Sequence, residues 1–519
     1  MIRALLVTLI FTVAAHAATP PPNIVYILAD DLGIGDVSCY NPKSAWQTPH
    51  LDRLARDGLR FTDAHSASSL CTPARYALLT GRYAWRGRLK QGVLQGYHPP
   101  LIEAGRKTVA SFLREHGYTT AVFGKWHLGL DWVRTGPQLE NVDFAQPFAH
   151  GPLTHGFDRF FGISASLDMP PYVWLANDRA TAVPIATIGD SPVPKLWRGG
   201  PIGPDFKMED VQPRLIEKSL AFFAERAIAR DAKPFFLYLP LAAPHTPILP
   251  TSEFDGKTKV TSYGDFVLQV DADIGRLVAA LEKHGLAKNT LIIFTSDNGF
   301  APAADVPAHA KFNHDPSAGY RGYKSDLFEG GHRVPFIAQW PAVIKAGTTT
   351  SALVEQLDLF ATCAEILHAK IPTTAAEDSV SFLPLLRGEK PTSAARTTLV
   401  SHSAEGRFSI RDDRWKLLLW PGSGGWSSPT PAPSVWLKTH RTDLATLPPF
   451  QLYDLSVDPA ETTNLAAVHP EIVQRLGRLL RADIERGRSK PGASQPVVTG
   501  PDWPQIAWFA SFPSTSSTP

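Results

Sequence analysis

The stretch Asn23-Ile24-Val25-Tyr26-Ile27-Leu28-Ala29-Asp30-Asp31 places a short apolar and β-branched run directly before two carboxylates. Comparable runs recur along the chain, at residues 119–123, 235–239, 290–295 and 334–339. Segments with helical periodicity separate them, at residues 49–57, 107–116, 213–229 and 263–284. This alternation is typical of βαβ units. The sequence therefore predicts a large α/β domain with a mostly parallel sheet flanked by helices.

The alternation of strand-like and helical segments ends near residue 390. Short runs at residues 398–401, 407–410, 415–419 and 451–455 are typical of an antiparallel sheet, and residues 470–486 have the periodicity of an amphipathic helix. We predict a main domain over residues 18–390 and a smaller C-terminal α+β subdomain over residues 391–519. Its last residues, 511–519, are mostly Ser, Thr and Pro and are expected to fray.

The overall composition excludes several functional classes. The chain has 519 residues, with 51 Lys plus Arg against 49 Asp plus Glu, so its formal net charge is only +2. Such a chain has no long-range field suited to nucleic acid, and we expect no nucleic-acid partner. The 44% hydrophobic content excludes intrinsic disorder. Three cysteines cannot form a disulfide framework, and Cys39 and Cys363 are expected to be buried thiols rather than a pair.

The N-terminus has the form of a signal peptide over residues 1–17. Arg3 precedes the apolar stretch 4–14, and Ala15-His16-Ala17 has the small-x-small form of a cleavage site. No lipid-anchoring cysteine follows, and no other apolar run reaches the roughly 18 residues that span a bilayer. We therefore expect recognition by the export machinery and no stable membrane insertion. The sequence has no Asn-x-Ser/Thr acceptor, which favours a bacterial periplasmic or secreted protein.

Polar side chains follow four of the predicted strands. Asp30-Asp31 follows the first, Lys125 and His127 the second, His245 the third and Asp297-Asn298 the fourth. Each alone has an ordinary explanation, such as a turn or a solvated loop. Ligands bind at the carboxyl ends of strands in parallel sheets, so together these residues predict one site at that edge.

Four of these residues, Asp30, Asp31, Asp297 and Asn298, supply only oxygen ligands. Hard divalent cations prefer such ligands, so Ca²⁺ is the first choice and Mg²⁺ the second. Without an ion, three crowded carboxylates would repel one another strongly. The sequence therefore predicts a cation held by these residues.

A helix is predicted to start at Cys71-Thr72-Pro73-Ala74-Arg75. Thr72 can cap it and Pro73 can occupy its first turn, which leaves Cys71 at the positive end of the helix. An anion or oxyanion is stabilised at that end. Cys71 is therefore a candidate nucleophile.

Cys71-x-Pro73-x-Arg75 with Thr80-Gly81 resembles the signature of the type I sulfatases, an arylsulfatase-like family of the alkaline phosphatase superfamily. The other motifs of that family occur in order, at residues 30–33, 124–129, 297–299 and 324–335. The resemblance covers essentially the whole mature chain. It implies that residues 18–390 form the catalytic domain of a sulfuric ester hydrolase.

The resemblance also implies a mechanism. A separate maturation enzyme would oxidise Cys71 to Cα-formylglycine, which joins the ligands of the cation. One hydroxyl of the hydrated aldehyde would attack sulfur, while His245 protonates the leaving alcohol. The second hydroxyl, deprotonated with help from His127, would collapse to the aldehyde and expel sulfate.

The same resemblance assigns roles to further polar residues. Lys125, Lys324 and His245 would contact the sulfate group and complement charge that develops in the transition state. Arg75 would hold the nucleophile and the metal carboxylates in position. Ser166 stands where some family members carry a sulfate-contacting serine.

The alcohol that carries the sulfate is expected to be recognised by loops other than those that bind the sulfate. Residues 166–174 and 177–179, with Trp420, Trp426 and Trp436, offer hydrogen-bonding and stacking groups suited to a sugar, or else pack the two domains together. A sulfate ester of galactose or N-acetylgalactosamine is the preferred substrate, and an aryl sulfate is a simpler one. Two alternatives stay open: a formylglycine-dependent phosphonate monoester or phosphodiester hydrolase, and a non-catalytic glycan-binding protein whose thiol is never converted.

Overall fold

The computed structural model describes residues 20–192, 195–231, 233–390, 395–427, 444–497 and 503–513. The predicted signal peptide, the proposed boundary at residue 390 or 391 and Trp436 fall outside or at the edge of these ranges, so they stay predictions. Among the described helices, none combines the length and apolarity that a bilayer crossing requires. Cys39 and Cys363 are free thiols.

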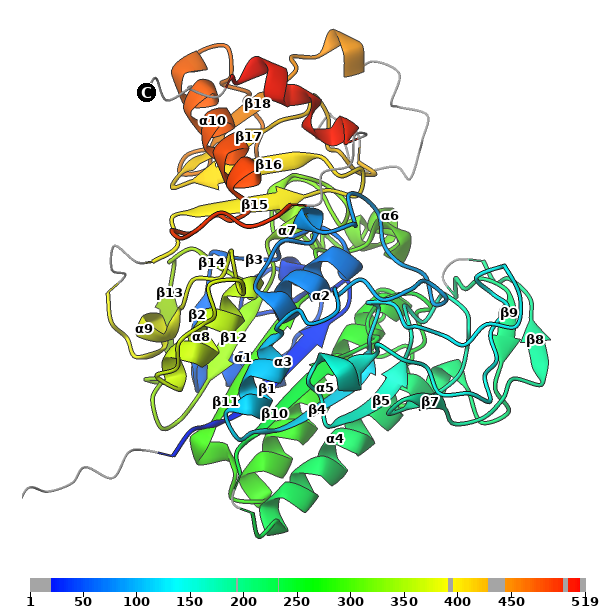
Figure 1. Cartoon of the computed structure of the whole chain (residues 1–519). Coiled ribbons are helices and arrows are strands. Elements are labelled where there is room, and N and C mark those ends of the chain that lie inside the picture. Colours follow the sequence, from blue (N-terminus) through cyan, green and yellow to red (C-terminus); the bar gives the residue numbers. More distant parts are fainter. Residues whose placement is uncertain are drawn as a thin grey trace, which may run out of the picture.

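The main domain is built on one ten-stranded sheet (Figure 1). From edge to edge its strands are β13 (Thr348–Thr350), β2 (Leu59–Phe61), β12 (Phe336–Gln339), β11 (Thr290–Ser296), β1 (Asn23–Ala29), β10 (Phe235–Pro240), β4 (Thr119–Lys125), β5 (Arg159–Ile163), β6 (Leu175–Ala176) and β7 (Arg179–Ala180). The five central strands, β11 to β5, run parallel. The predicted α/β class is therefore confirmed.

The edges of the sheet depart from the parallel arrangement. β12 pairs antiparallel with both β11 and β2. At the other edge, β6 pairs antiparallel with β5, and β7 pairs antiparallel with β6. The run predicted at 334–339 is β12, which starts two residues later, at Phe336. Small strands elsewhere form two-stranded pairs, which are β3 (Ala64–His65) with β14 (Val354–Glu355) and β8 (Ala186–Ile188) with β9 (Gly200–Ile202).

Helices cover both faces of this sheet. One face carries α1 (Pro49–Arg56), α4 (Val211–Ile228) and α5 (Ser262–Lys283). The other carries α2 (Cys71–Thr80), α3 (Val109–Glu115) and α8 (Leu359–Ile366). The shorter helices of this domain include α6 (Val306–Ala310), α7 (Glu329–His332) and α9 (Leu383–Leu386).

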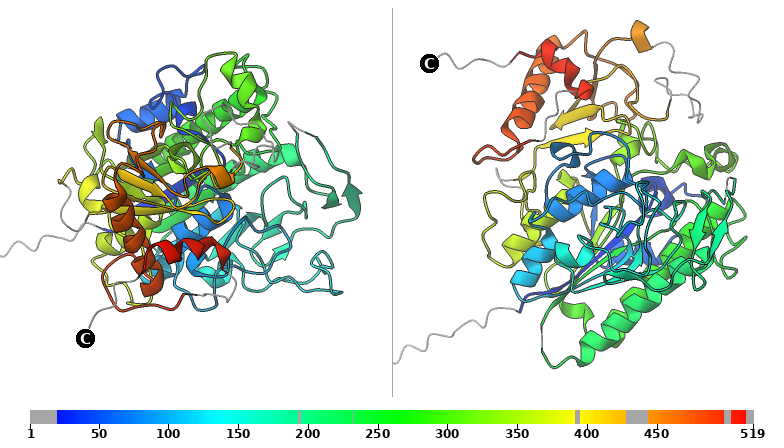
Figure 2. Two further views of the ribbon diagram at one scale, coloured as in Figure 1. Left: turned by 90° about the horizontal axis from the view of Figure 1, so that it is seen from above. Right: turned by 45° about the vertical axis from the view of Figure 1, so that its right-hand side comes forward.

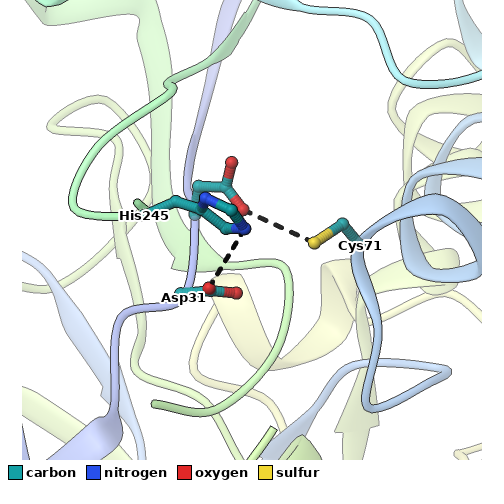
Figure 3. Close-up of side chains that lie close together, drawn as sticks. Asp31, Cys71 and His245 are labelled. Atoms are coloured by element: carbon teal, nitrogen blue, oxygen red, sulfur yellow. Dashed lines mark hydrogen bonds and ion pairs between the residues drawn. The ribbon is translucent and has the colours of Figure 1, made fainter. Parts of the chain in front are cut away.

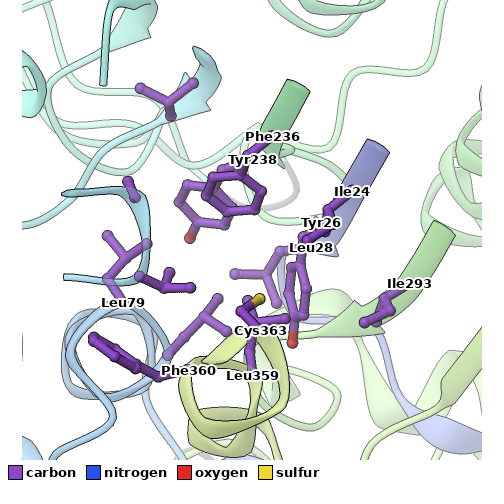
Figure 4. Packing of buried hydrophobic residues seen from close by; sticks show 14 of the residues in the cluster. Ile24, Tyr26, Leu28, Leu79, Phe236, Tyr238, Ile293, Leu359, Phe360 and Cys363 are labelled. Carbon is purple, nitrogen blue, oxygen red and sulfur yellow. The ribbon is translucent and has the colours of Figure 1, made fainter. Parts of the chain in front are cut away.

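Alternate residues of β1 face the two helical layers. Tyr26 and Leu28 lie in the cluster that contains Leu359 and Cys363 of α8 (Figure 4), whereas Val25 and Ile27 belong to the cluster beneath α1, α4 and α5. A strand covered on both faces must be apolar at every position, which explains the uninterrupted apolar run that precedes Asp30. The two cores fix the end of β1, and thereby the place of the acidic residues that follow it.

The C-terminal subdomain sits over one end of the main domain (Figure 2). Its antiparallel sheet has the order β15 (Thr398–His402), β16 (Phe408–Asp412), β17 (Trp415–Leu418) and β18 (Gln451–Asp454), with α10 (Pro470–Arg486) packed on it. The expectation of fraying is wrong for residues 511–513: Ser511 ends a 3₁₀ helix, and Phe512 is fully buried because Gly477 of α10 leaves room for its ring.

A buried ion-pair network joins the subdomain to the main domain. Lys416 of β17 contacts Glu329 of α7 at 3.0 Å and Glu461 at 2.9 Å, and all three side chains are inaccessible to solvent. Arg333 also pairs with Glu329, at 2.8 Å. Buried charges of this kind are tolerated only while every partner is present.

Lys416→Met should therefore destabilise the protein, because it leaves two carboxylates buried with one cation fewer. We expect a loss of about 3–5 kcal/mol, seen as a lower urea midpoint. Lys345→Met, at an exposed position, is the control and should change stability by about 0.5 kcal/mol at most. Equal midpoints for the two variants would contradict a linking role for this network.

Candidate active site

The residues predicted from the strand ends lie together at the carboxyl edge of the central strands. β1 ends at Ala29 and the chain turns at Asp31, whose φ is 64°. His245 follows β10, and Cys71 faces it from the start of α2 (Figure 3). Asp30, Asp31, Cys71 and His245 each offer a potential ligand atom, and these atoms all lie within 4.8 Å of one another.

Asp297 and Asn298 adjoin this group through Asp31. Asn298 Nδ2 donates to Asp31 Oδ1 at 2.7 Å, and the backbone N–H of Asp31 donates to Asp297 Oδ1 at 3.3 Å. The Cys71 thiol is 3.6 Å from Asp30 Oδ1. Residues from opposite halves of the chain thus share one site, as predicted from their positions after β1 and β11.

Arg75 ties the acidic residues to the sheet. Its guanidinium is fully buried and donates twice to Asp297 Oδ2, at 2.8 and 3.0 Å, and once to the carbonyl of Lys125 at 2.8 Å. Asp30 Oδ2 is 3.6 Å away. Arg75 therefore contacts the carboxylates, as expected, and it holds the end of β4 as well.

Two lysines lie directly on the carboxylates. Lys125 Nζ is 2.6 Å from Asp30 Oδ2, and Lys324 Nζ is 2.6 Å from Asp31 Oδ1. Ser166 Oγ accepts from Lys125 at 3.1 Å and lies 3.2 Å from His245 Nε2, so this serine belongs to the site. Burial opposes ionisation of Asp30, but Lys125, His245 and Arg75 outweigh that effect and lower its pKa.

The predicted repulsion among three carboxylates is offset within the protein. Asp30, Asp31 and Asp297 are countered by the three cations Arg75, Lys125 and Lys324, so the predicted repulsion is wrong as a sign of a missing ion. A divalent cation is therefore not needed to neutralise the acids. When bound, it would leave the site with a net positive charge, which suits an anionic substrate.

Cys71 is the first residue of α2, and Leu70 is its N-cap. The expectation that Thr72 caps the helix is wrong. Its hydroxyl instead donates to the carbonyl of His127 at 3.1 Å and accepts from the N–H of Leu94, so it anchors the helix to neighbouring loops. Burial raises the pKa of Cys71, and the unmodified thiol is therefore protonated and weakly nucleophilic.

His127 is held as a neutral base. Its Nε2–H donates to the carbonyl of Leu94 at 2.7 Å, which leaves Nδ1 as the unprotonated nitrogen. Nδ1 is buried and has no hydrogen-bond partner among the described residues. Burial, Lys125 and Arg75 all lower the pKa of His127 well below its usual range.

His245 faces both the carboxylates and the serine. Its Nε2 is 3.4 Å from Asp31 Oδ2, and its Nδ1 contacts the carbonyl of Thr246. With Nδ1–H donating to that carbonyl, Nε2 is directed toward the reacting groups. This orientation suits a proton donor to a leaving oxygen.

Comparison with known proteins identifies the family. The sulfatase family model matches residues 22–369, and a model for the C-terminal region of N-sulphoglucosamine sulphohydrolase matches residues 322–423. The chain is 36% identical to N-acetylgalactosamine-6-O-sulfatase of Bacteroides thetaiotaomicron over 89% of this chain and 93% of that protein. The chain belongs to the sulfatase family.

Other relatives agree with this assignment, and the sulfatase is a sulfuric ester hydrolase. Arylsulfatase A of Bos taurus is 36% identical over 90% of this chain and 88% of its own length. A structure from work on the metabolism of multiple glycosaminoglycans by Bacteroides thetaiotaomicron has a TM-score of 0.78 at 34% identity and covers 90% of this chain and all of its own. A phosphonate monoester hydrolase of Agrobacterium radiobacter, at 20% identity and a TM-score of 0.56, shares the fold; it covers 89% of this chain and 94% of its own.

The site of this sulfatase opens into a cavity of about 310 Å³. Cys71, His127, Ser166, His245 and Lys324 all contribute to its lining. The cavity therefore joins the candidate nucleophile, both histidines and a lysine in one space.

Only some of the residues predicted to contact the substrate line this cavity. Trp426 lines it, whereas Trp420 lies outside it and stacks under Arg407 at 3.5 Å. Residues 177–179 form the turn between β6 and β7 and do not reach the cavity. Asp168 and Met169, which belong to the predicted loop at residues 166–174, do line it. Arg198 lines it as well, although no role was assigned to it and no motif in the sequence surrounds it.

The oxygen atoms of the site fit a hard divalent cation. Asn298 Oδ1 is buried and lacks a hydrogen-bond partner within the described ranges, an arrangement that costs free energy unless a ligand or ion meets it. Carboxylates of Asp30, Asp31 and Asp297 lie beside it. These four residues could hold the ion, together with the modified side chain at position 71.

Added Ca²⁺ should raise the unfolding temperature of this sulfatase, because an ion that binds only the folded state stabilises it by about 2.7 kcal/mol at 100 times its Kd. Asp31→Asn should reduce that shift, measured by calorimetry with chelator as the reference. Asp271→Asn is the matched control, since Asp271 is buried elsewhere and accepts from the backbone of Leu51. An undiminished shift in Asp31→Asn would contradict the site.

Proposed function

We propose that this chain is an exported bacterial sulfatase that removes sulfate from carbohydrates, with galactose or N-acetylgalactosamine esters as the preferred substrates. Its nucleophile would be Cα-formylglycine made from Cys71 by a maturation enzyme, and its ion Ca²⁺, or Mg²⁺ as second choice. The observation that carries the proposal is the buried contact of Cys71 with Asp30, at the start of a helix and beside two lysines and two histidines.

The unmodified thiol does not suit the reaction. Its raised pKa keeps it protonated, and its burial among Asp30 and Asp297 disfavours a thiolate further. Formylglycine, as its hydrate, supplies a hydroxyl nucleophile and an internal route for releasing sulfate. A bound cation would polarise the sulfuryl group and stabilise the ionised nucleophile.

Sulfate binding and proton transfer would be carried out by different residues of the chain. Lys324 lines the cavity and would contact a sulfate oxygen, while Lys125 is held beside it by Asp30 and Ser166 and would complement the charge that develops on the sulfate group. His245 donates a proton to the leaving oxygen from Nε2. His127 takes a proton at Nδ1, which is free for that purpose, when sulfate is released.

A carbohydrate is preferred for two reasons. The first relative named above acts, by its name, on N-acetylgalactosamine. The cavity also combines Asp168 and Arg198 with Trp426 and Met169, a mixture of polar and apolar groups that suits a sugar ring. Export rests on the predicted signal peptide at residues 1–17.

The maturation step can be tested directly on protein from the native host or from cells that also make the maturation enzyme. Mass spectrometry should find an aldehyde in place of the thiol at Cys71, while Cys39 and Cys363 remain thiols. Cys71→Ala should lose turnover while its unfolding temperature stays close to that of the wild type. Full turnover by protein with an unmodified Cys71 would refute the nucleophile.

The role of His245 predicts a dependence on the leaving group. His245→Asn should lower kcat by about 10²–10⁴-fold on a sugar sulfate, whose alkoxide needs a proton, and far less on nitrophenyl sulfate, whose phenolate leaves unaided. His150→Asn, at an exposed position, is the control. Equal losses on both substrates would exclude proton donation by His245.

The same panel should include a nitrophenyl phosphodiester and a phosphonate monoester. We expect sulfate to be the best substrate, since the relatives with the highest identity named above are sulfatases. Preference for either phosphorus ester would favour the alternative hydrolase, and no turnover by fully converted protein would favour a glycan-binding role.

A further inference from the structure

Asp168 belongs to the loop at residues 166–174, which the sequence predicts to contact a sugar, but that prediction assigns it no specific contact. It follows Ser166 in a turn closed by the hydrogen bond from the N–H of Met169 to the carbonyl of Ser166 at 2.9 Å. Only 4% of the residue is exposed, yet it lines the same cavity as Cys71 and His245. The turn fixes its distance from the serine that contacts Lys125.

Arg198 holds one side of this carboxylate. Its Nη1 donates to Asp168 Oδ2 at 2.5 Å, and its backbone N–H donates to the Asp168 carbonyl at 3.0 Å. Tyr172 OH donates to the carbonyl of Arg198 at 2.5 Å, which fixes the arginine in turn. Asp168 therefore cannot rotate freely, and its two oxygens have distinct surroundings.

The other oxygen, Asp168 Oδ1, is buried and has no hydrogen-bond partner in the described part of the chain. A purely structural ion pair with Arg198 leaves such an oxygen unsatisfied, which costs free energy in the folded protein. Burial would raise the pKa of Asp168, but His245, Arg198 and Lys125 outweigh it and lower that pKa. The group is thus a carboxylate, which can only accept hydrogen bonds.

We propose that Asp168 is a specificity-determining residue whose Oδ1 accepts a hydrogen bond from a ring hydroxyl of the sugar that carries the sulfate. The inference rests on the proposed function. Arg198 is a positioning residue for this contact. A carboxylate at this place favours a neutral hydroxyl and disfavours a second sulfate or a uronate carboxylate, because those groups offer no donor and carry like charge.

The rest of the cavity fits a sugar ring held in this way. Trp426 and Met169 line it with apolar surface, which can cover the hydrophobic face of a pyranose. Lys324 and His245 line the same cavity and would meet the sulfate end. Asp168 supplies the directional contact on the part of the sugar that the sulfate-binding residues do not reach.

The test compares Asp168→Asn with wild type on N-acetylgalactosamine 6-sulfate, its 3-deoxy and 4-deoxy analogues, and nitrophenyl sulfate. We expect the ratio of kcat/KM for the sugar sulfate to that for the aryl sulfate to fall by about 10- to 100-fold in the variant. One deoxy analogue should lose a similar factor with the wild type and little more with Asp168→Asn. Asp178→Asn, an exposed aspartate outside the cavity, is the control and should keep the wild-type ratio.

The outcomes separate the two proposals. Parallel losses on sugar and aryl sulfates, or additive losses with both deoxy analogues, would overturn the role of Asp168 and leave the proposed function standing. Turnover of the aryl sulfate without turnover of any sugar sulfate by the wild type would overturn the carbohydrate specificity, and this inference with it. A loss of kcat/KM that the wild type shows with only one deoxy analogue, and that Asp168→Asn does not show, would support both the proposed function and the role of Asp168. That analogue would also identify the hydroxyl that Asp168 contacts.

Discussion

The pairing of three buried carboxylates with three buried cations is the constraint on which the rest of the structure depends. Asp30, Asp31 and Asp297 follow adjacent parallel strands, where little water reaches them. Each isolated charge would cost several kcal/mol in such a place. Their partners come from α2, the end of β4 and the loop before α7. The charges are therefore satisfied only when the whole sheet and its helices have assembled.

This charge balance also determines the chemistry. The three acids and three cations cancel, so a bound divalent ion would make the cavity attractive to an anionic ester and not to a neutral one. His127 stands apart from that balance, because burial and the neighbouring cations keep it neutral. His245 does not, because it contributes to the lowered pKa of Asp30.

The strand ends explain how much could be predicted from the sequence. Central strands such as β1 are apolar throughout, so the polar residues after them stand out and predict a shared edge. Strand pairing is harder to predict: β12 runs antiparallel to both β11 and β2, and nothing local to residues 336–339 encodes those neighbours. Leu70 replaces Thr72 as the N-cap of α2 for a similar reason, since Thr72 is engaged by Leu94 and His127.

The contact between Asp168 and Arg198 is a feature of the site that could not be predicted from the sequence. They are thirty positions apart, and their contact depends on how the loops after β5 and β8 fold over the cavity. The side chain of Arg198 is 51% exposed, whereas that of Lys125, at the end of β4, is fully buried. Loop residues can therefore change substrate preference without disturbing the central charges. Asp168 is the exception, because its buried charge and His245 affect each other. A change in proton donation by His245 would itself alter the ratio between sugar and aryl sulfates, so the deoxy analogues are what distinguish a direct contact of Asp168 with the sugar.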